Sequence, residues 1–110
     1  MQHRIVPNLW FDTEAEEAAA FYVSVFGGDS RVTKVTHYTE AGPGTPGTVM
    51  TVEFELDGQA FVGINGGPQF PFSEAVSFQI DCETQAEVDR FWDALTADGE
   101  ESQCGWLRDR

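Results

Sequence analysis

The residues of this sequence that could carry chemistry are mainly carboxylates, together with two histidines and two cysteines. General acid–base catalysis needs two groups that face the same reacting atom. The acid pairs Glu53/Glu55 and Glu100/Glu101 stand at alternate or adjacent positions, and this spacing does not bring two carboxylates together in a cleft. We therefore interpret both pairs as solvated surface residues.

Histidine and cysteine give equally little support for a reactive centre. His3 and His37 are isolated in the sequence, and a single histidine is more often a surface or core residue than a metal ligand. Cys82 and Cys104 form no CxxC pair and are too few for a disulfide scaffold. A catalytic thiol would also need a nearby base, so we interpret both cysteines as structural thiols.

The glycine-rich segment Asn65-Gly66-Gly67-Pro68 resembles a phosphate-binding loop only superficially. It lacks the GxGxxG spacing, and no helix is expected to follow it. We interpret it as a turn that connects two parts of the chain.

Composition limits the possible partners. The chain of 110 residues fits one small domain, and its net charge is −13. Nucleic acids and anionic membranes need clustered cations, so we expect neither as a partner. The sequence contains no apolar run long enough to span a membrane and no signal-peptide pattern, which makes the cytoplasm the expected location. The excess of acidic residues either keeps the protein soluble or reflects adaptation to a cytoplasm of high salt concentration.

A short sequence motif occurs twice in the chain. Asp12–Glu16 follows one apolar run, and Glu83–Glu87 follows another. In each copy a threonine is followed three residues later by glutamate, the spacing of a capping box that starts a helix. The boxes are Thr13 with Glu16 and Thr84 with Glu87. A repeated strand–cap–helix unit predicts two similar modules, with a binding groove between them.

The first module is predicted to be β-α-β-β-β. Apolar residues at helical spacing follow the first capping box, and Gly27-Gly28 ends that helix. Strict alternation predicts a half-buried strand at 49–56, and Asp57-Gly58 predicts a hairpin. The other predicted strands are 5–11, 31–39 and 59–65.

The second module is predicted to be incomplete. A strand is expected at 75–81, and a helix that ends at Gly99 follows it, with Val88, Phe91, Trp92 and Leu95 on its apolar face. A last short strand could begin at 101–106. We thus expect one domain over 1–110, with a first module at 4–65 and an incomplete second module at 75–110.

These elements resemble the vicinal-oxygen-chelate superfamily, the glyoxalase, bleomycin-resistance and dioxygenase group, and above all its PhnB-like branch, often labelled demethylubiquinone 3-methyltransferase-like. The resemblance implies an α+β fold of paired β-α-β-β-β modules, the second truncated. Relatives continue beyond the equivalent of Arg110 and complete the second sheet. The segments that carry the resemblance are Leu9–Asp12, Ala18–Phe26, Val49–Gly58, Asn65–Phe70, Cys82–Thr84 and Gln103–Leu107.

The resemblance also predicts which positions would hold a metal ion. Chelating relatives use His or Gln on the first strand, Glu on the fourth, His on the fifth and Glu on the eighth. The first three positions fall here on Ile5, on Phe61, and on Ala75 or Val76, and the eighth strand is missing. None of these side chains binds a divalent ion, so we expect no metal and no cofactor.

The expected ligand site is the groove between the modules. If Val6 and Trp10 pack on the helix, then Pro7 and Leu9 face the groove. Six residues are the candidate ligand contacts: Leu9, Tyr38, Asn65, Ser77, Gln79 and Trp106.

The function expected from this resemblance is metal-free binding of a small molecule, in a homodimer or as part of a longer natural chain. One alternative is an enzyme of the same superfamily, either a metal-dependent lyase or dioxygenase or a methyltransferase. A methyltransferase would use S-adenosylmethionine, yet no glycine-rich turn joins a strand to a helix in this sequence. A third possibility is a purely structural dimerisation module.

Overall fold

A computed structural model describes residues 4–42, 44–73, 75–97, 99–101 and 107–108 of the chain. The chain divides into two compact units, Met1–Ser73 and Glu74–Arg110. Of the described residues, neither helix has the length and apolar character needed to span a bilayer.

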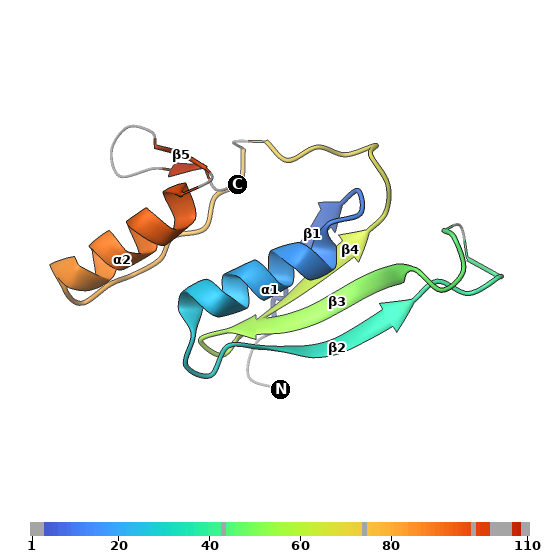
Figure 1. The fold of residues 1–110 in the computed structure, drawn as a ribbon, viewed down its shortest axis with the longest axis horizontal. Helices are drawn as coiled ribbons and strands as arrows, with labels where there is room; N and C mark the ends of the chain where they lie inside the picture. Colours follow the sequence, from blue (N-terminus) through green and yellow to red (C-terminus); the bar gives the residue numbers. More distant parts are fainter. Residues whose placement is uncertain (1–3, 43, 74, 98, 102–106, 109–110) are drawn as a thin grey trace. The chain divides into compact units, whose positions relative to one another are not determined.

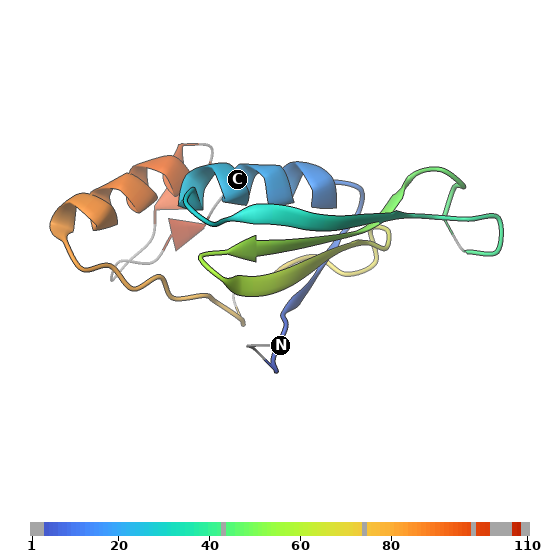
Figure 2. The ribbon, with the colours of Figure 1, turned by 90° about the horizontal axis from the view of Figure 1, so that it is seen from below.

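The first unit is a four-stranded sheet with one helix on it (Figures 1 and 2). Its elements are β1 (Asn8–Phe11), α1 (Ala15–Phe26), β2 (Arg31–His37), β3 (Val49–Leu56) and β4 (Gln59–Asn65). The strand order is β1-β4-β3-β2. Strand β1 runs parallel to β4, and the other two pairs are antiparallel. The predicted β-α-β-β-β module is therefore confirmed, and with it the α+β fold class.

Local sequence explains most of this unit. The alternation in β3 places Val52, Phe54 and Leu56 on one side, and all three are buried. Asp57 and Gly58 both have positive φ, 50° and 86°, as a two-residue hairpin turn requires. The predicted strand at 5–11 begins later, at Asn8, although the Pro7 carbonyl still accepts a hydrogen bond from Val62 N at 3.0 Å.

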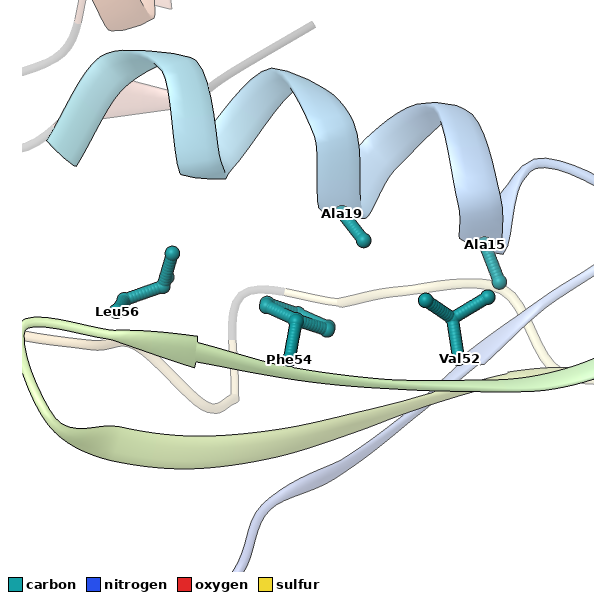
Figure 3. Packing of buried hydrophobic residues seen from close by; sticks show 5 residues of the cluster. All are labelled: Ala15, Ala19, Val52, Phe54 and Leu56. Carbon is teal, nitrogen blue, oxygen red and sulfur yellow. The ribbon is translucent and has the colours of Figure 1, made fainter. Parts of the chain in front are cut away.

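The core of the first unit lies between α1 and β3. Ala15 and Ala19 of the helix meet Val52, Phe54 and Leu56 of the strand (Figure 3). Small residues on the helix let its backbone approach the sheet closely, while the sheet supplies the large side chains. Burying each large apolar side chain in this way stabilises the folded state by roughly 1.5–3 kcal/mol.

The first predicted capping box is wrong. Helix α1 has Glu14 as its N-cap residue, with no hydrogen bond from its own side chain. The Thr13 hydroxyl instead donates to Glu14 Oε1 at 3.4 Å. Ala15 is the first residue of the helix, and its backbone N–H donates to the side chain of Asn65 at the end of β4. The distance from Ala15 N to Asn65 Oδ1 is 2.9 Å. A long-range cap has replaced the local one.

The second unit contains α2 (Gln85–Thr96) and a small pair of strands, β5 (Glu100–Glu101) and β6 (Leu107–Arg108). Here the predicted capping box is confirmed: Thr84 Oγ1 accepts from Glu87 N at 3.2 Å, and Glu87 Oε2 accepts from Glu83 N at 2.9 Å. Phe91 and Leu95 are the buried residues of α2.

The strand predicted at 75–81 is wrong. These residues form no strand, and Val76 and Phe78 are 71% and 54% exposed. An extended segment is stabilised as a strand by the hydrogen bonds of a neighbour, and no described segment is paired with this one. Alternation of apolar and polar residues is therefore not enough by itself to make this segment a strand. The possible strand at 101–106 falls largely outside the described residues.

The two helix starts should respond differently to the same substitution. Thr84→Ala should cost about 1 kcal/mol of unfolding free energy, because a real cap is lost. Thr13→Ala should lower the unfolding free energy by less than about 0.5 kcal/mol, because substitutions of exposed residues outside a cap usually have effects of this size. Urea unfolding of both variants, followed by circular dichroism, measures the difference. Equal losses would contradict the cap assignment.

Candidate functional site

The sheet of the first unit has two different faces. Gly63 of β4 lies against the helix, since a Cβ there would stand 3.1 Å from the Ala15 Cβ. Its strand partners are Leu9 and Val52. Because paired residues share a face and neighbours along a strand alternate, Leu9 belongs to the helix side and Trp10 to the opposite side. This reverses the predicted orientation of β1, which assigned Trp10 to the helix.

The side opposite α1 is here called the open face, because α1 is the helix of the first unit and covers the other side (Figure 2). Its centre is apolar, with Trp10, Val62 and Ile64 half-buried. Towards β2 it becomes polar, and the hydroxyls of Thr36 and Thr51 share a short hydrogen bond. By strand register the open face comprises Asn8, Trp10, Arg31, Lys34, Thr36, Thr51, Glu53, Glu55, Ala60, Val62 and Ile64.

Trp10 is held in one orientation at the edge of the open face. Its indole N–H donates to the Gly67 carbonyl at 2.8 Å. The ring also lies so close to Gly66 that a Cβ there would come within 2.2 Å of it. A larger residue at position 66 would displace the ring, so Gly66 is required by packing. This contact gives the glycine-rich turn a structural role.

An aromatic pocket adjoins Trp10 at the carboxyl end of β1. It has a volume of about 270 Å³ and is lined by Trp10, Phe11, Asp12, Glu14, Gly67, Pro68, Phe70, Pro71 and Phe72. Phe70 and Phe72 are 63% and 61% exposed. Exposed aromatic rings around a hollow are typical of binding surfaces.

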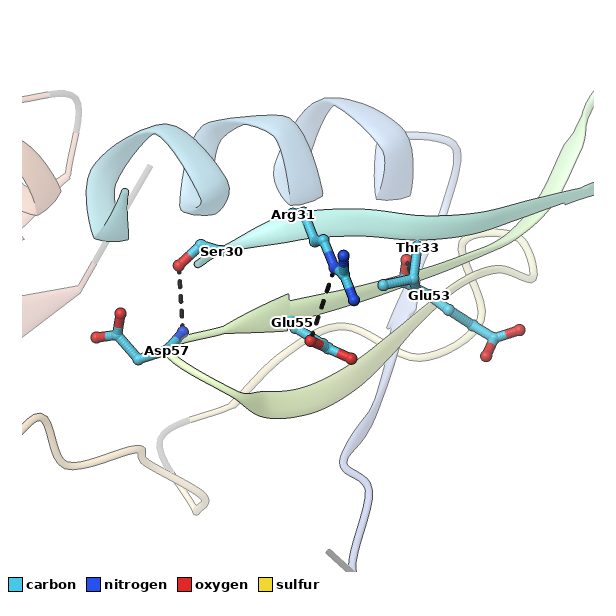
Figure 4. A network of polar contacts seen from close by, with 6 residues as sticks. All are labelled: Ser30, Arg31, Thr33, Glu53, Glu55 and Asp57. Atoms are coloured by element: carbon cyan, nitrogen blue, oxygen red, sulfur yellow. Dashed lines mark hydrogen bonds and ion pairs between the residues drawn. The ribbon is translucent and has the colours of Figure 1, made fainter. Parts of the chain in front are cut away.

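A second hollow, of about 400 Å³, is polar. It is lined by Gly28, Asp29, Ser30, Arg31 and Glu55. Arg31 and Glu55 form an exposed ion pair at 3.9 Å, and Ser30 Oγ accepts from Asp57 N at 3.1 Å (Figure 4). An exposed pair of this kind contributes little energy. The aromatic pocket, with the open face, is the stronger candidate site.

Comparison with known proteins identifies the family. A sequence model of the 3-demethylubiquinone-9 3-methyltransferase family matches residues 3–110. The chain belongs to this family. A solved PhnB protein from Bacillus cereus is 38% identical, with a TM-score of 0.78 over 89% of this chain and 77% of that chain. The predicted PhnB-like resemblance is thus confirmed.

A second solved structure, of a Pseudomonas aeruginosa protein, agrees in fold. It has a TM-score of 0.70 at 21% identity and covers 90% of this chain and 76% of that chain. No curated protein matches the chain significantly. The family and the glyoxalase-like fold are therefore established.

Two predicted site residues of this family member lie together. The Tyr38 hydroxyl donates to the Asn65 backbone carbonyl through a short hydrogen bond. Asn65 is only 9% exposed, and its side chain is fully engaged: Oδ1 accepts from Ala15 N, and Nδ2 donates to the Val49 carbonyl at 3.1 Å. These contacts give Asn65 a structural role in this unit.

The remaining predicted residues are spread over different environments. Leu9 is on the helix side of the sheet by register. Ser77 and Gln79 are exposed in the second unit, where Gln79 Nε2 donates to Asp81 Oδ1 at 2.8 Å. Trp106 lies outside the described residues. Sequence reasoning did not single out Trp10, Phe70 and Phe72, although Phe70 and Phe72 follow Gly66-Gly67 at alternate positions, which is a visible signal.

The positions aligned with metal ligands of relatives are apolar. Ile5 is 80% exposed ahead of β1, and Phe61 stacks on Phe54 at the helix side of the sheet, with ring centroids 5.4 Å apart. Val76 is exposed in the second unit. Within the described part of the chain, no three His, Cys, Asp or Glu residues gather closely enough to hold a metal ion.

Proposed function

We propose that this chain is a metal-free small-molecule binding protein of the PhnB-like branch and the wider vicinal-oxygen-chelate superfamily. The observation that carries the proposal is the one-sided sheet. Helix α1 packs on one face, while Trp10, Val62 and Ile64 remain half-buried on the other. The apolar centre of this face has polar residues beside it on β2 and β3, and small-molecule sites commonly combine an apolar surface with a few polar groups.

The polar groups of the open face could orient a ligand without a metal. The hydroxyl pair Thr36 and Thr51 offers donors and acceptors beside the apolar centre. The apolar residues at the aligned ligand positions also favour a metal-free site. Of the predicted contacts, Tyr38 is proposed to shape the end of the sheet through its hydrogen bond to the Asn65 carbonyl, and Leu9, Asn65, Ser77, Gln79 and Trp106 stay proposals.

The family description names a methyl transfer, which makes an enzyme the alternative. The connection between β1 and α1, Asp12–Glu14, contains no glycine, whereas nucleotide-type cofactors favour a glycine-rich turn there. Incubation with S-adenosylmethionine and a demethylated quinone, followed by mass spectrometry, would reveal methyl transfer. A methylated product would replace the binding proposal with the enzymatic one.

The binding proposal is tested by a matched pair of substitutions. A fragment library is screened by NMR against the chelator-treated chain, and ligands should shift backbone amides of β1, β3 and β4. Ile64→Arg should weaken the best ligand about tenfold or more, because it removes an apolar contact and adds a large charge. Ile5→Arg introduces the same residue at an exposed site and should leave the affinity unchanged.

Three results would contradict this proposal. One is equal loss of affinity in both arginine variants. Another is the absence of any fragment that shifts open-face amides. The third is a rise in melting temperature when zinc or manganese is added, because a ligand that favours the native state must stabilise it.

We further propose that the protein acts in the cytoplasm as a homodimer. The second unit exposes three large apolar side chains, Val76 at 71%, Phe78 at 54% and Val88 at 42%. Exposed apolar groups of this kind mark association surfaces, and a second copy could cover them. Sedimentation equilibrium of the 110-residue chain should give twice the monomer mass. A monodisperse monomer that binds no hydrophobic dye would contradict the proposal.

A further inference from the structure

The aromatic pocket of the first unit combines aromatic rings with acidic side chains. We propose that it binds an organic cation, such as a quaternary ammonium group. The inference rests on the proposed function, because the pocket shares Trp10 with the open face, and it names the chemical class of the ligand.

The rings of the pocket are arranged in two edge-to-face pairs. Trp10 and Phe70 have centroids 4.9 Å apart at 80°, and Phe11 and Phe72 have centroids 5.1 Å apart at 72°. The hydrogen bond from the Trp10 indole to Gly67 fixes one ring in advance. Ring faces attract cations through their quadrupole, and tryptophan attracts them most strongly. Several rings around one hollow therefore favour a cation over a neutral group.

The charge around the pocket has the matching sign. Asp12 and Glu14 line it, and no lysine or arginine is among its lining residues. Neither an exposed aspartate nor an exposed glutamate would by itself make a site, but both stand next to the rings. The net charge of −13 adds a long-range attraction for cations. An anionic or nucleotide ligand would meet repulsion at the same place.

The size of the pocket fits a small cation. Its volume of about 270 Å³ could hold a trimethylammonium group with a short substituent. Phe70 and Phe72 are more than half exposed, so a ligand could gain contact with both rings on binding. Shielding rings from water strengthens the attraction between cation and ring.

The test compares choline with 3,3-dimethylbutan-1-ol, a neutral molecule of nearly the same shape. The full 110-residue chain is titrated at constant ionic strength, and NMR follows the indole N–H of Trp10. Choline should shift this signal saturably and bind about tenfold more tightly than the neutral alcohol, as expected for more than one cation–ring contact. Equal binding of both molecules, or no saturable shift with choline, would overturn the proposal.

Two sets of variants locate the binding. Phe70→Ala should weaken choline about three- to tenfold; Phe70 is exposed, so the substitution should leave the fold intact. The double variant Asp12→Asn, Glu14→Gln should also weaken choline. The matched double variant Asp57→Asn, Glu40→Gln removes the same charge at exposed positions that do not line the pocket and should have little effect. Equal effects of the two double variants would indicate general attraction to an acidic surface and would overturn the site.

Failure of this proposal is distinguishable from failure of the proposed function. If fragments bind the open face and respond to Ile64→Arg while choline does not bind, the proposed function stands and the cation pocket is wrong. If choline binds and Phe70→Ala weakens its binding, while Ile64→Arg affects no ligand, the cation pocket is supported and the open-face site is wrong.

Discussion

Replacing Phe54 by alanine should destabilise the first unit by about 3–5 kcal/mol, the range for phenylalanine in a packed core. Phe54 is 2% exposed and lies in the centre of the core, between α1 and β3 (Figure 3). Its ring also stacks on Phe61 at an interplanar angle of 13°. The substitution loses the transfer free energy of the ring and leaves a cavity. The whole stability of a small domain is about 5–15 kcal/mol, so the loss should be a large part of it.

Urea unfolding monitored by circular dichroism measures this loss, and Phe70→Ala is its control. Phe70 is the same residue type but is 63% exposed, so its replacement should change the unfolding free energy by less than about 1 kcal/mol. Phe54→Leu should fall between the two, since most of the apolar volume is kept. A loss below about 1 kcal/mol for Phe54→Ala would contradict the described core.

The first unit could be predicted from the sequence because its signals are local. The alternation in Val49–Leu56 has the period of a strand, and Asp57-Gly58 specifies a tight turn between two strands that are neighbours in the chain. Gly27 ends α1 with φ of 62°, as the residue type allows. Each of these features depends on a few adjacent residues.

The orientation of β1 could not be obtained in this way. The side-chain period of a strand is two, so an error of one residue exchanges its faces. Strand β1 is short and apolar on both sides, and its sequence therefore does not distinguish Leu9 from Trp10. The distinction comes from pairing with Gly63 and Ile64, more than 50 residues away along the chain. The predicted orientation of Leu9 and Trp10 was wrong for this reason.

The predicted strand at 75–81 failed for a related reason. Its pattern of apolar and polar residues suits a strand, but a strand also requires a neighbouring chain to accept and donate its backbone hydrogen bonds. In the second unit no described segment pairs with it. The helix that follows needs no such neighbour, and its cap at Thr84 was predicted correctly.

The start of α1 shows how a non-local contact can replace a local signal. Thr13 had the right residue type and spacing for a cap, yet the Ala15 N–H is satisfied by Asn65 at the end of β4. The same amide group donates to the Val49 carbonyl of β3. One side chain thus joins the helix to two strands. No pattern within the helix sequence reports a partner 50 residues away.

Asn65→Ala should therefore cost about 2–4 kcal/mol of unfolding free energy, more than the loss of an ordinary helix cap. The Ala15 amide is in a residue with 0% exposure, so water cannot easily replace the lost acceptor. The Val49 carbonyl loses its donor in the same substitution. Urea unfolding gives the loss, and the amide of Ala15 should exchange with deuterium much faster in the variant.

The matched control is Asn8→Ala. The Asn8 side chain donates to the Val6 carbonyl at 2.9 Å, but it is exposed and bonds only within its own segment. Its replacement should cost less than about 0.5 kcal/mol, because water takes the place of the lost partner. If the two alanine variants had equal stability, Asn65 would not be the cap of α1, and the helix would be held to β4 by side-chain packing such as that of Ala15 against Gly63.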